Sequence, residues 1–115
     1  MGGICHVEIP CTDFEKAKKF YGDVFGWETQ IIPEMDYAVF RVKDGPGGGF
    51  SKQLKVSDSG ILFYIEVEDI ENTLKKVDTA GGKTVKGKTE ISPEMGYFAI
   101  FTDSENNVNG LWAKK

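Results

Sequence analysis

Residues 33–40 read PEMDYAVF, and residues 93–101 read PEMGYFAIF. The shared phrase, proline–glutamate–methionine–x–tyrosine, is followed each time by residues that favour a β-strand. So particular a phrase is not expected twice by chance in a chain of 115 residues. The repetition predicts an internal duplication, in which the phrase marks the same connection in each copy.

The duplication extends over most of the chain. A shift of 56 residues places DFEKAKKFYGDVFGW, which begins at Asp13, on DIENTLKKVDTAGGK, which begins at Asp69. The shift grows to 60 at the repeated phrase and to 61 after it, as a few loop insertions would produce. Because the length suits one domain, we expect a single domain, 1–115, made of two repeats at about 1–56 and 57–115.

The first copy begins with CHVEIPC, which alternates polar and apolar residues and therefore predicts a half-buried strand at 5–11. Thr12 and Glu15 have the spacing of a capping box and predict the start of a helix. An apolar stripe at helical spacing continues as far as Gly26, a typical helix end. Three extended stretches are expected next, at roughly 27–32, 37–43 and 49–54.

The second copy begins with ILFYIEV (61–67), a run apolar enough to predict an interior strand. Asp69 can cap the following helix, and Gly81 and Gly82 end it. The polar stretch 57–60 is expected to join the copies. Strands are expected near 83–90, 97–102 and 107–113.

The order β-α-β-β-β, occurring twice, predicts the α+β class. Two helices cannot cover both faces of eight strands, so one face of each sheet is left for solvent, a partner or a ligand. If the two sheets curl toward each other, their free faces form a cleft.

Bulk composition excludes several classes of function. The net charge of −4, with both signs interspersed, argues against a nucleic-acid surface. The sequence contains no apolar run near 18 residues and no signal-like start, so neither a membrane nor secretion is expected. Cys5 and Cys11 would lie about 20 Å apart on one strand, beyond disulfide reach, which fits a reducing cytoplasm. Their register with Val7 and Ile9 predicts that both are buried.

HVEIPCTDFEKAKKFYGDVFGW (6–27), the paired β-α-β-β-β units and the ending DSENNVNGLW (103–112) resemble the vicinal-oxygen-chelate superfamily. This superfamily includes glyoxalases, bleomycin-resistance proteins and extradiol dioxygenases. The resemblance covers nearly the whole chain and implies curved mixed sheets around a cleft, and a homodimer. A pair of ferredoxin-like units is the alternative fold, which explains the GLW ending less well.

The resemblance also implies where a divalent metal would bind in a family enzyme. His6 stands seven residues before Asp13 and matches the first ligand position. The other three positions hold Gly49, Leu62 and Gly110, which have no side-chain donor. Because a catalytic metal needs about three protein ligands and His6 is the only histidine, we expect no metal or other cofactor. A divalent ion held through His6 is the alternative.

Strand alternation predicts which side chains face the cleft. The side chains on the other face of each strand are nearly all apolar and are expected to form the core under the helices. Aromatic walls with a few polar groups suit a small-molecule pocket. Each residue also has an ordinary interpretation, as a solvated polar group or a packing aromatic. The predicted cleft residues are His6, Glu8, Ser51, Tyr64, Glu66 and Trp112.

Three functions are consistent with this pattern. The first is a metal-independent binder of a small organic molecule, similar to the bleomycin-resistance branch. The second is a metal-dependent lyase or isomerase of the lactoylglutathione lyase (glyoxalase) type, or a dioxygenase-related enzyme. It would use His6, with Glu8 and Glu66 as candidate catalytic residues or cation ligands. The third is a dimeric interaction module with a vestigial cleft.

Overall fold

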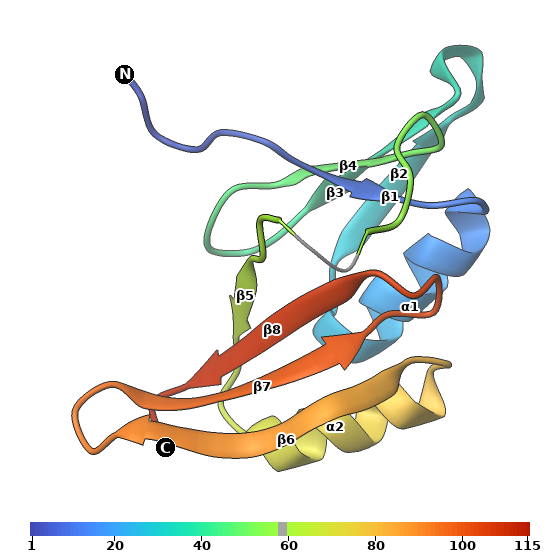
Figure 1. Cartoon of the computed structure of the whole chain (residues 1–115). Helices are drawn as coiled ribbons and strands as arrows, with labels where there is room; N and C mark the ends of the chain where they lie inside the picture. Colours follow the sequence, from blue (N-terminus) through green and yellow to red (C-terminus); the bar gives the residue numbers. More distant parts are fainter. Residues whose placement is uncertain (58–59) are drawn as a thin grey trace. The chain divides into compact units, whose positions relative to one another are not determined.

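The computed structural model describes residues 1–57 and 60–115 (Figure 1). Backbone contacts divide the chain into two compact units, Met1–Val56 and Ser57–Lys115. The polar join predicted at 57–60 includes residues 58 and 59, which lie outside the described residues. Each unit has the order β-α-β-β-β, with a short 3-10 helix added in the first. The α+β class and the paired units predicted from the repeat are therefore confirmed.

The first unit is a four-stranded mixed sheet, here called sheet A, with one α-helix. Its strand order is β1-β4-β3-β2, with β1 parallel to β4 and the other neighbours antiparallel. The elements in chain order are β1 (Val7–Pro10), α1 (Phe14–Phe25), β2 (Glu28–Ile32), η1 (Pro33–Met35), β3 (Tyr37–Arg41) and β4 (Gly48–Ser51).

The second unit repeats this arrangement in a sheet called sheet B. Its order is β5-β8-β7-β6, again with the first pair parallel and the others antiparallel. The strand order is the same in both sheets, so the two sequence repeats form units of the same topology. The elements are β5 (Tyr64–Glu66), α2 (Ile70–Thr79), β6 (Lys83–Ser92), β7 (Gly96–Thr102) and β8 (Val108–Ala113).

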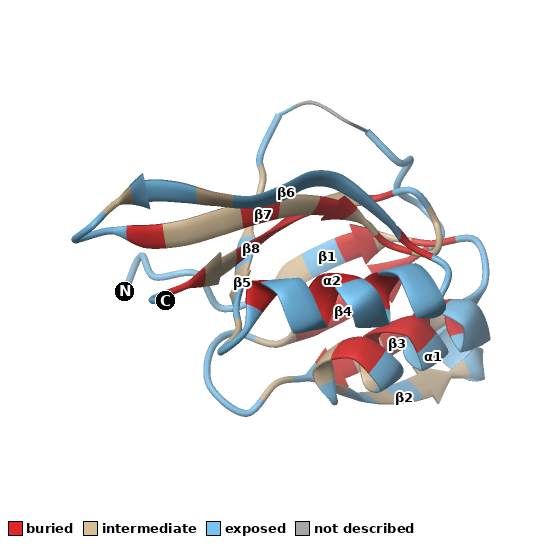
Figure 2. Cartoon of the chain, turned by 90° about the horizontal axis from the view of Figure 1, so that it is seen from below, coloured by how far each residue is buried: buried red, intermediate tan, exposed pale blue. Residues whose placement is uncertain are grey.

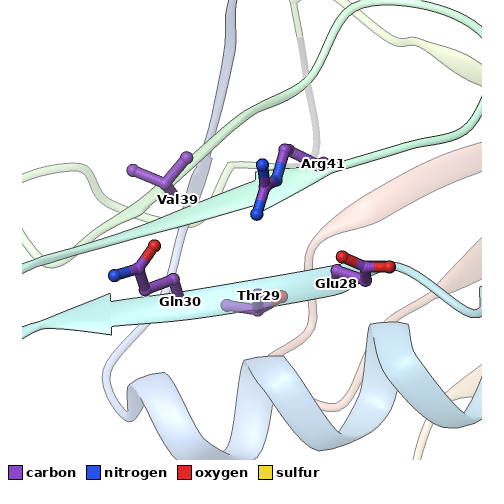
Figure 3. Close-up of a pocket in the computed structure, with 5 residues that line it drawn as sticks. All are labelled: Glu28, Thr29, Gln30, Val39 and Arg41. Atoms are coloured by element: carbon purple, nitrogen blue, oxygen red, sulfur yellow. The ribbon is translucent and has the colours of Figure 1, made fainter.

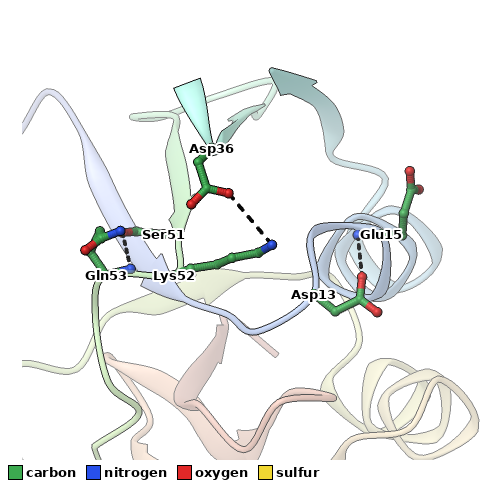
Figure 4. Close-up of polar contacts among 6 residues, drawn as sticks. All are labelled: Asp13, Glu15, Asp36, Ser51, Lys52 and Gln53. Carbon is green, nitrogen blue, oxygen red and sulfur yellow. Dashed lines mark hydrogen bonds and ion pairs between the residues drawn. The ribbon is translucent and has the colours of Figure 1, made fainter. Parts of the chain in front are cut away.

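Both α-helices begin at an aspartate. The Asp13 side chain accepts hydrogen bonds from the amides of Glu15 (3.0 Å) and Lys16 (3.3 Å), as Figure 4 shows for the first. The predicted cap, Thr12, is therefore wrong by one residue, because Asp13 has the extended backbone and reaches the free amides. Asp69 caps α2 as predicted, accepting from the Asn72 amide at 3.0 Å. Gly26 ends α1 in the left-handed conformation, also as predicted.

The core of each unit lies between its helix and its sheet. Along both helices, buried positions alternate with exposed ones, as amphipathic helices require (Figure 2). In the first unit, the Tyr21 ring of α1 contacts Phe50 of β4, with centroids 5.4 Å apart. In the second, Ile70 and Val77 of α2 are fully buried. The inner strands β4 and β8 are the most buried strands.

The repeated phrase forms the turn between two antiparallel strands in each unit. It connects β2 to β3 through η1, and β6 to β7. Its fourth residue, Asp36 or Gly96, adopts a left-handed backbone in both units, with φ of 49° and 83°. A side chain on Gly96 would overlap the Ala113 carbonyl, so only glycine fits there. The phrase therefore marks equivalent connections, as predicted.

Two predictions about the first strands are wrong. The run 61–67 was expected to be an interior strand, but β5 has three residues and pairs only with β8 in the described part of sheet B. Its apolar start is exposed at Ile61. Cys5 was expected to be buried and is exposed, because the chain at that point has not yet joined sheet A; Cys11 is buried as predicted.

The strand predicted at 49–54 ends at Ser51, and a turn follows. Among the described residues, no helix has the length and apolar character that crossing a membrane requires.

Candidate functional site

Strand register divides the residues of sheet A between two faces. Ile9, Phe40 and Phe50 are buried on the helix-facing side. The opposite side, here called the open face, carries Glu8, Tyr37, Val39, Arg41 and Gly49, with Glu28 and Gln30 from β2. The predicted alternation of β1 is therefore confirmed: Ile9 is buried and Glu8 is exposed. His6 stands just before β1 and is also exposed.

Tyr37 joins two of the predicted site residues on the open face. Its hydroxyl donates a hydrogen bond to Glu8 Oε2 at 2.8 Å and lies 2.8 Å from His6 Nε2. Because the hydroxyl proton goes to the carboxylate, the imidazole serves as donor when Nε2 is protonated. The His6 and Tyr37 rings are nearly parallel, with centroids 6.4 Å apart. His6, Glu8 and Tyr37 therefore form one hydrogen-bonded group, the Tyr37 cluster.

The electrostatics of the cluster keep the Tyr37 hydroxyl protonated. Burial, followed by the hydrogen bond to Glu8 and the charge of its carboxylate, raises the pKa of Tyr37 to about 12. Each of these causes disfavours the phenolate. At neutral pH, Tyr37 is therefore a hydrogen-bond donor and is unsuited to act as a base.

The Tyr37 ring occupies the space that a side chain at residue 49 would need. A β-carbon built on Gly49 would overlap the phenol ring and hydroxyl of Tyr37. The glycine therefore lets the ring lie against the backbone of β4. Sequence reasoning missed Tyr37, because it considered only the first and last strands of each repeat. The pairing of Val39 with Gly49 would have indicated that alternate residues of β3, including Tyr37, lie on the same face as Gly49.

Ser51, another predicted cleft residue, lies at the end of β4. It is 5% exposed, and its hydroxyl accepts a hydrogen bond from the Gln53 amide at 3.1 Å (Figure 4). Next to it, the Lys52 ammonium lies 3.8 Å from the Asp36 carboxylate and 4.5 Å from the Phe14 ring centroid. Ser51 thus helps to shape the turn after β4.

The second unit carries the remaining predicted site residues. Tyr64 is 49% exposed and pairs with Gly110, while Glu66 is exposed and pairs with Trp112. The partly buried Trp112 donates its indole N–H to the Met95 carbonyl at 2.8 Å, which ties β8 to the repeated turn. A β-carbon on Gly110 would overlap the Tyr64 ring. A tyrosine ring therefore lies against a glycine in both units.

The four positions where the resemblance implies metal ligands do not supply a donor set. His6 is the one imidazole, and it already contacts Tyr37. Tyrosine rings lie against Gly49 and Gly110, and Leu62 precedes β5. Within residues 1–57 and 60–115, no three His, Cys, Asp or Glu side chains gather closely enough to hold a metal ion. The side chains present do not fit the family's metal.

A hollow of about 300 Å³ lies at the β2–β3 side of sheet A (Figure 3). It is lined by Glu28, Thr29, Gln30, Val39 and Arg41, none of which the sequence reasoning singled out. Val39 lies two residues from Tyr37 on the same strand and face. The hollow and the Tyr37 cluster therefore belong to one surface. The cleft between the two sheets, predicted from the sequence, stays a prediction.

Comparison with known proteins agrees with this fold. Residues 4–43 match the family model for the N-terminal part of bleomycin resistance protein-like domains. A glyoxylase-like domain-containing protein of Didymella fabae is 36% identical over 96% of this chain and 92% of its own length. A putative glyoxylase of Mycobacterium bovis is 25% identical over 92% of this chain, which spans 43% of that protein.

Two solved structures share the fold at low sequence identity. One is a glyoxalase/bleomycin resistance protein/dioxygenase family enzyme from Burkholderia phytofirmans, with a TM-score of 0.76, 19% identity, and coverage of 96% of this chain and 97% of that one. The other is the fosfomycin resistance protein FosX from Listeria monocytogenes, with a TM-score of 0.79, 14% identity, and coverage of 100% and 93%. By its near-complete match to the Didymella relative and by its fold, the chain belongs to the vicinal-oxygen-chelate (glyoxalase/bleomycin-resistance) superfamily.

Proposed function

We propose that this protein binds a small organic molecule without a metal, in the manner of the bleomycin-resistance branch of its superfamily. One observation carries the proposal: a tyrosine ring lies against the glycine at two expected ligand positions, Tyr37 on Gly49 and Tyr64 on Gly110. A ligating side chain could enter either position only if the ring moved.

The same arrangement favours an organic ligand. Aromatic rings provide flat apolar area, and their hydroxyl groups add a few directed hydrogen bonds. Tyr37 has its hydroxyl oriented by Glu8 and His6. In this proposal the ligand lies in the cleft predicted from the sequence, and the protein acts in the cytoplasm as a homodimer.

The metal content of the purified protein tests the proposal that binding does not require a metal. Protein purified without chelator should contain far less than one equivalent of zinc, nickel or manganese by elemental analysis. The His6→Ala variant should give the same values, because no donor set surrounds His6. One bound equivalent that is lost in His6→Ala would overturn the proposal.

Intrinsic fluorescence tests the binding part. The Trp27→Phe protein retains Trp112 as its single indole, and a panel of planar aromatic compounds should quench it. In that background, Tyr64→Ala should weaken binding about fivefold, because a stacked ring contributes on the order of 1 kcal/mol. Val85→Ala, an exposed residue of β6, is the control and should leave affinity unchanged. Absence of any binding would favour the interaction module.

A second candidate function has one observation in its favour. His6 Nε2 and Glu8 Oε2 both lie 2.8 Å from the same hydroxyl oxygen, so they are close to each other. If Tyr37 moved away, the two could act together in a metal-dependent lyase or isomerase of the glyoxalase type. Such an activity should depend on added metal and should be lost in both His6→Ala and Glu8→Gln. Glu66 stays a candidate catalytic residue.

A further inference from the structure

The hollow on the open face contains one acidic and one basic side chain directly opposite each other. Glu28 on β2 and Arg41 on β3 are partners in the antiparallel register. Figure 3 shows both side chains, together with those of Gln30 and Val39, on these two neighbouring strands. Opposite charges at paired positions usually contact and stabilise a sheet by a few tenths of a kcal/mol.

Here the two charges do not pair. Ion pairs do form elsewhere in the described part of the chain, between Lys19 and Asp23 and between Lys52 and Asp36. In that same part of the chain, no ion pair joins the Glu28 carboxylate to the Arg41 guanidinium. Both side chains are exposed. The carboxylate and the guanidinium therefore border the same hollow, each free to bind a ligand group of the opposite charge.

The other residues of the hollow and its volume restrict the class of ligand further. Val39 offers a small apolar surface, and the Gln30 amide offers one acceptor and two donors. A volume of about 300 Å³ is at the small end of ligand pockets. A ligand that suits this lining is small, carries both charges, and has an apolar part.

We propose that the hollow lined by Glu28, Gln30, Val39 and Arg41 binds a zwitterion of amino-acid type. The ligand carboxylate pairs with the Arg41 guanidinium, whose planar fork matches it in a bidentate arrangement. The ligand ammonium pairs with the Glu28 carboxylate, and the apolar side chain lies over Val39. The inference rests on the proposed function, because it names the class of ligand that the open face binds.

The test compares three probes that share the leucine side chain and differ in which charges they carry. Leucine carries both charges, N-acetyl-leucine only the negative one, and leucinamide only the positive one. Each is titrated into the ¹⁵N-labelled protein, and the backbone amide shifts of Gln30, Val39 and Arg41 report binding. Leucine should bind up to about fivefold more tightly than either analogue, because each exposed charged contact contributes up to about 1 kcal/mol.

Two variants assign the charges. Arg41→Gln should abolish the preference for leucine over leucinamide, because the carboxylate loses its partner. Glu28→Gln should abolish the preference over N-acetyl-leucine. Lys43→Gln and Glu34→Gln make the same charge changes at exposed residues outside the hollow and should preserve both preferences.

Three results would overturn the inference: no shifts at the hollow, equal affinity for the three probes, or preferences that survive both variants. Its failure can be separated from failure of the proposed function. If an aromatic compound quenches Trp112 and no metal is bound, the proposed function stands although the zwitterion inference fails. If one equivalent of metal depends on His6, the proposed function fails whatever the leucine titration gives.

Discussion

The position of Tyr37 on the open face depends on Gly49, which has no side chain. The ring can lie against β4 because residue 49 is a glycine, and the hydroxyl then reaches Glu8 and His6. The conflict at residue 49 involves the movable end of a side chain, whereas a β-carbon at Gly48 would overlap the Val7 backbone carbonyl. Substitutions at these neighbouring glycines should therefore have different consequences.

Gly49→Ala should displace Tyr37 and destabilise the protein by about 1–3 kcal/mol, measured by urea unfolding. In the double variant Gly49→Ala/Tyr37→Ala, the loss should be smaller than the sum of the single losses, because the conflicting ring is gone. Gly87→Ala is the matched control, since nothing lies within 4 Å of a β-carbon there. Additive losses would show that Tyr37 does not occupy this space.

Tyr37→Phe should reduce the free energy of unfolding by about 1–2 kcal/mol, because the hydroxyl bonds to Glu8 and His6 are lost. The folded-state pKa of about 12 exceeds the ordinary 10.0, so the hydroxyl's contribution is complete below pH 10 and is lost as pH rises toward 12. Urea unfolding of both proteins should therefore show a constant difference from pH 8 to 10 that shrinks above pH 10. A difference unchanged to pH 12 would contradict the raised pKa.

At the scale of secondary-structure elements, both helices depend on an aspartate at the first turn. Asp13→Ala should destabilise the protein by about 1 kcal/mol, because the amides of Glu15 and Lys16 lose their acceptor. Asp13→Asn retains a capping oxygen and should cost much less. Urea unfolding followed by circular dichroism gives both values. An equal loss in the two variants would assign the effect to the charge of Asp13.

The parallel pairing of β1 with β4 depends on Gly48. Gly48→Ala should cost about 3 kcal/mol or more, since its β-carbon would overlap the Val7 carbonyl and neither backbone can easily move. Hydrogen exchange of the Val7 and Ile9 amides should accelerate more than that of amides in sheet B. Unchanged protection of these amides would contradict the prediction.

At the scale of the whole molecule, we expect a homodimer. In the described residues, each sheet ends in strands paired on one side only: β1 and β2 in sheet A, β5 and β6 in sheet B. Such edges favour pairing with a second copy. Light scattering after size exclusion should give twice the 12.8 kDa of one chain. A mass of 12.8 kDa that does not rise with concentration would show a monomer.

Much of the fold could be predicted because patterns of neighbouring residues determine its helices, strands and turns. The repeated phrase, the helical stripes and the alternation in β1 depend on neighbours within a few residues, so the elements appeared close to their predicted bounds. The errors have separate causes. Thr12 and Asp13 are both good caps, and backbone geometry selected Asp13. An apolar run does not reveal how many partners its strand has, and among the described residues β5 pairs only with β8.

The candidate site was less predictable, because it depends on register between strands that are distant in the chain. The sequence by itself determined the duplication, the superfamily, and the absence of donors at residues 49, 62 and 110. Only the tertiary structure placed Tyr37 on Gly49 and Glu28 opposite Arg41. The physical reason is that period and residue type act along the chain, whereas contact across a sheet requires strand order and register, which the packed core selects.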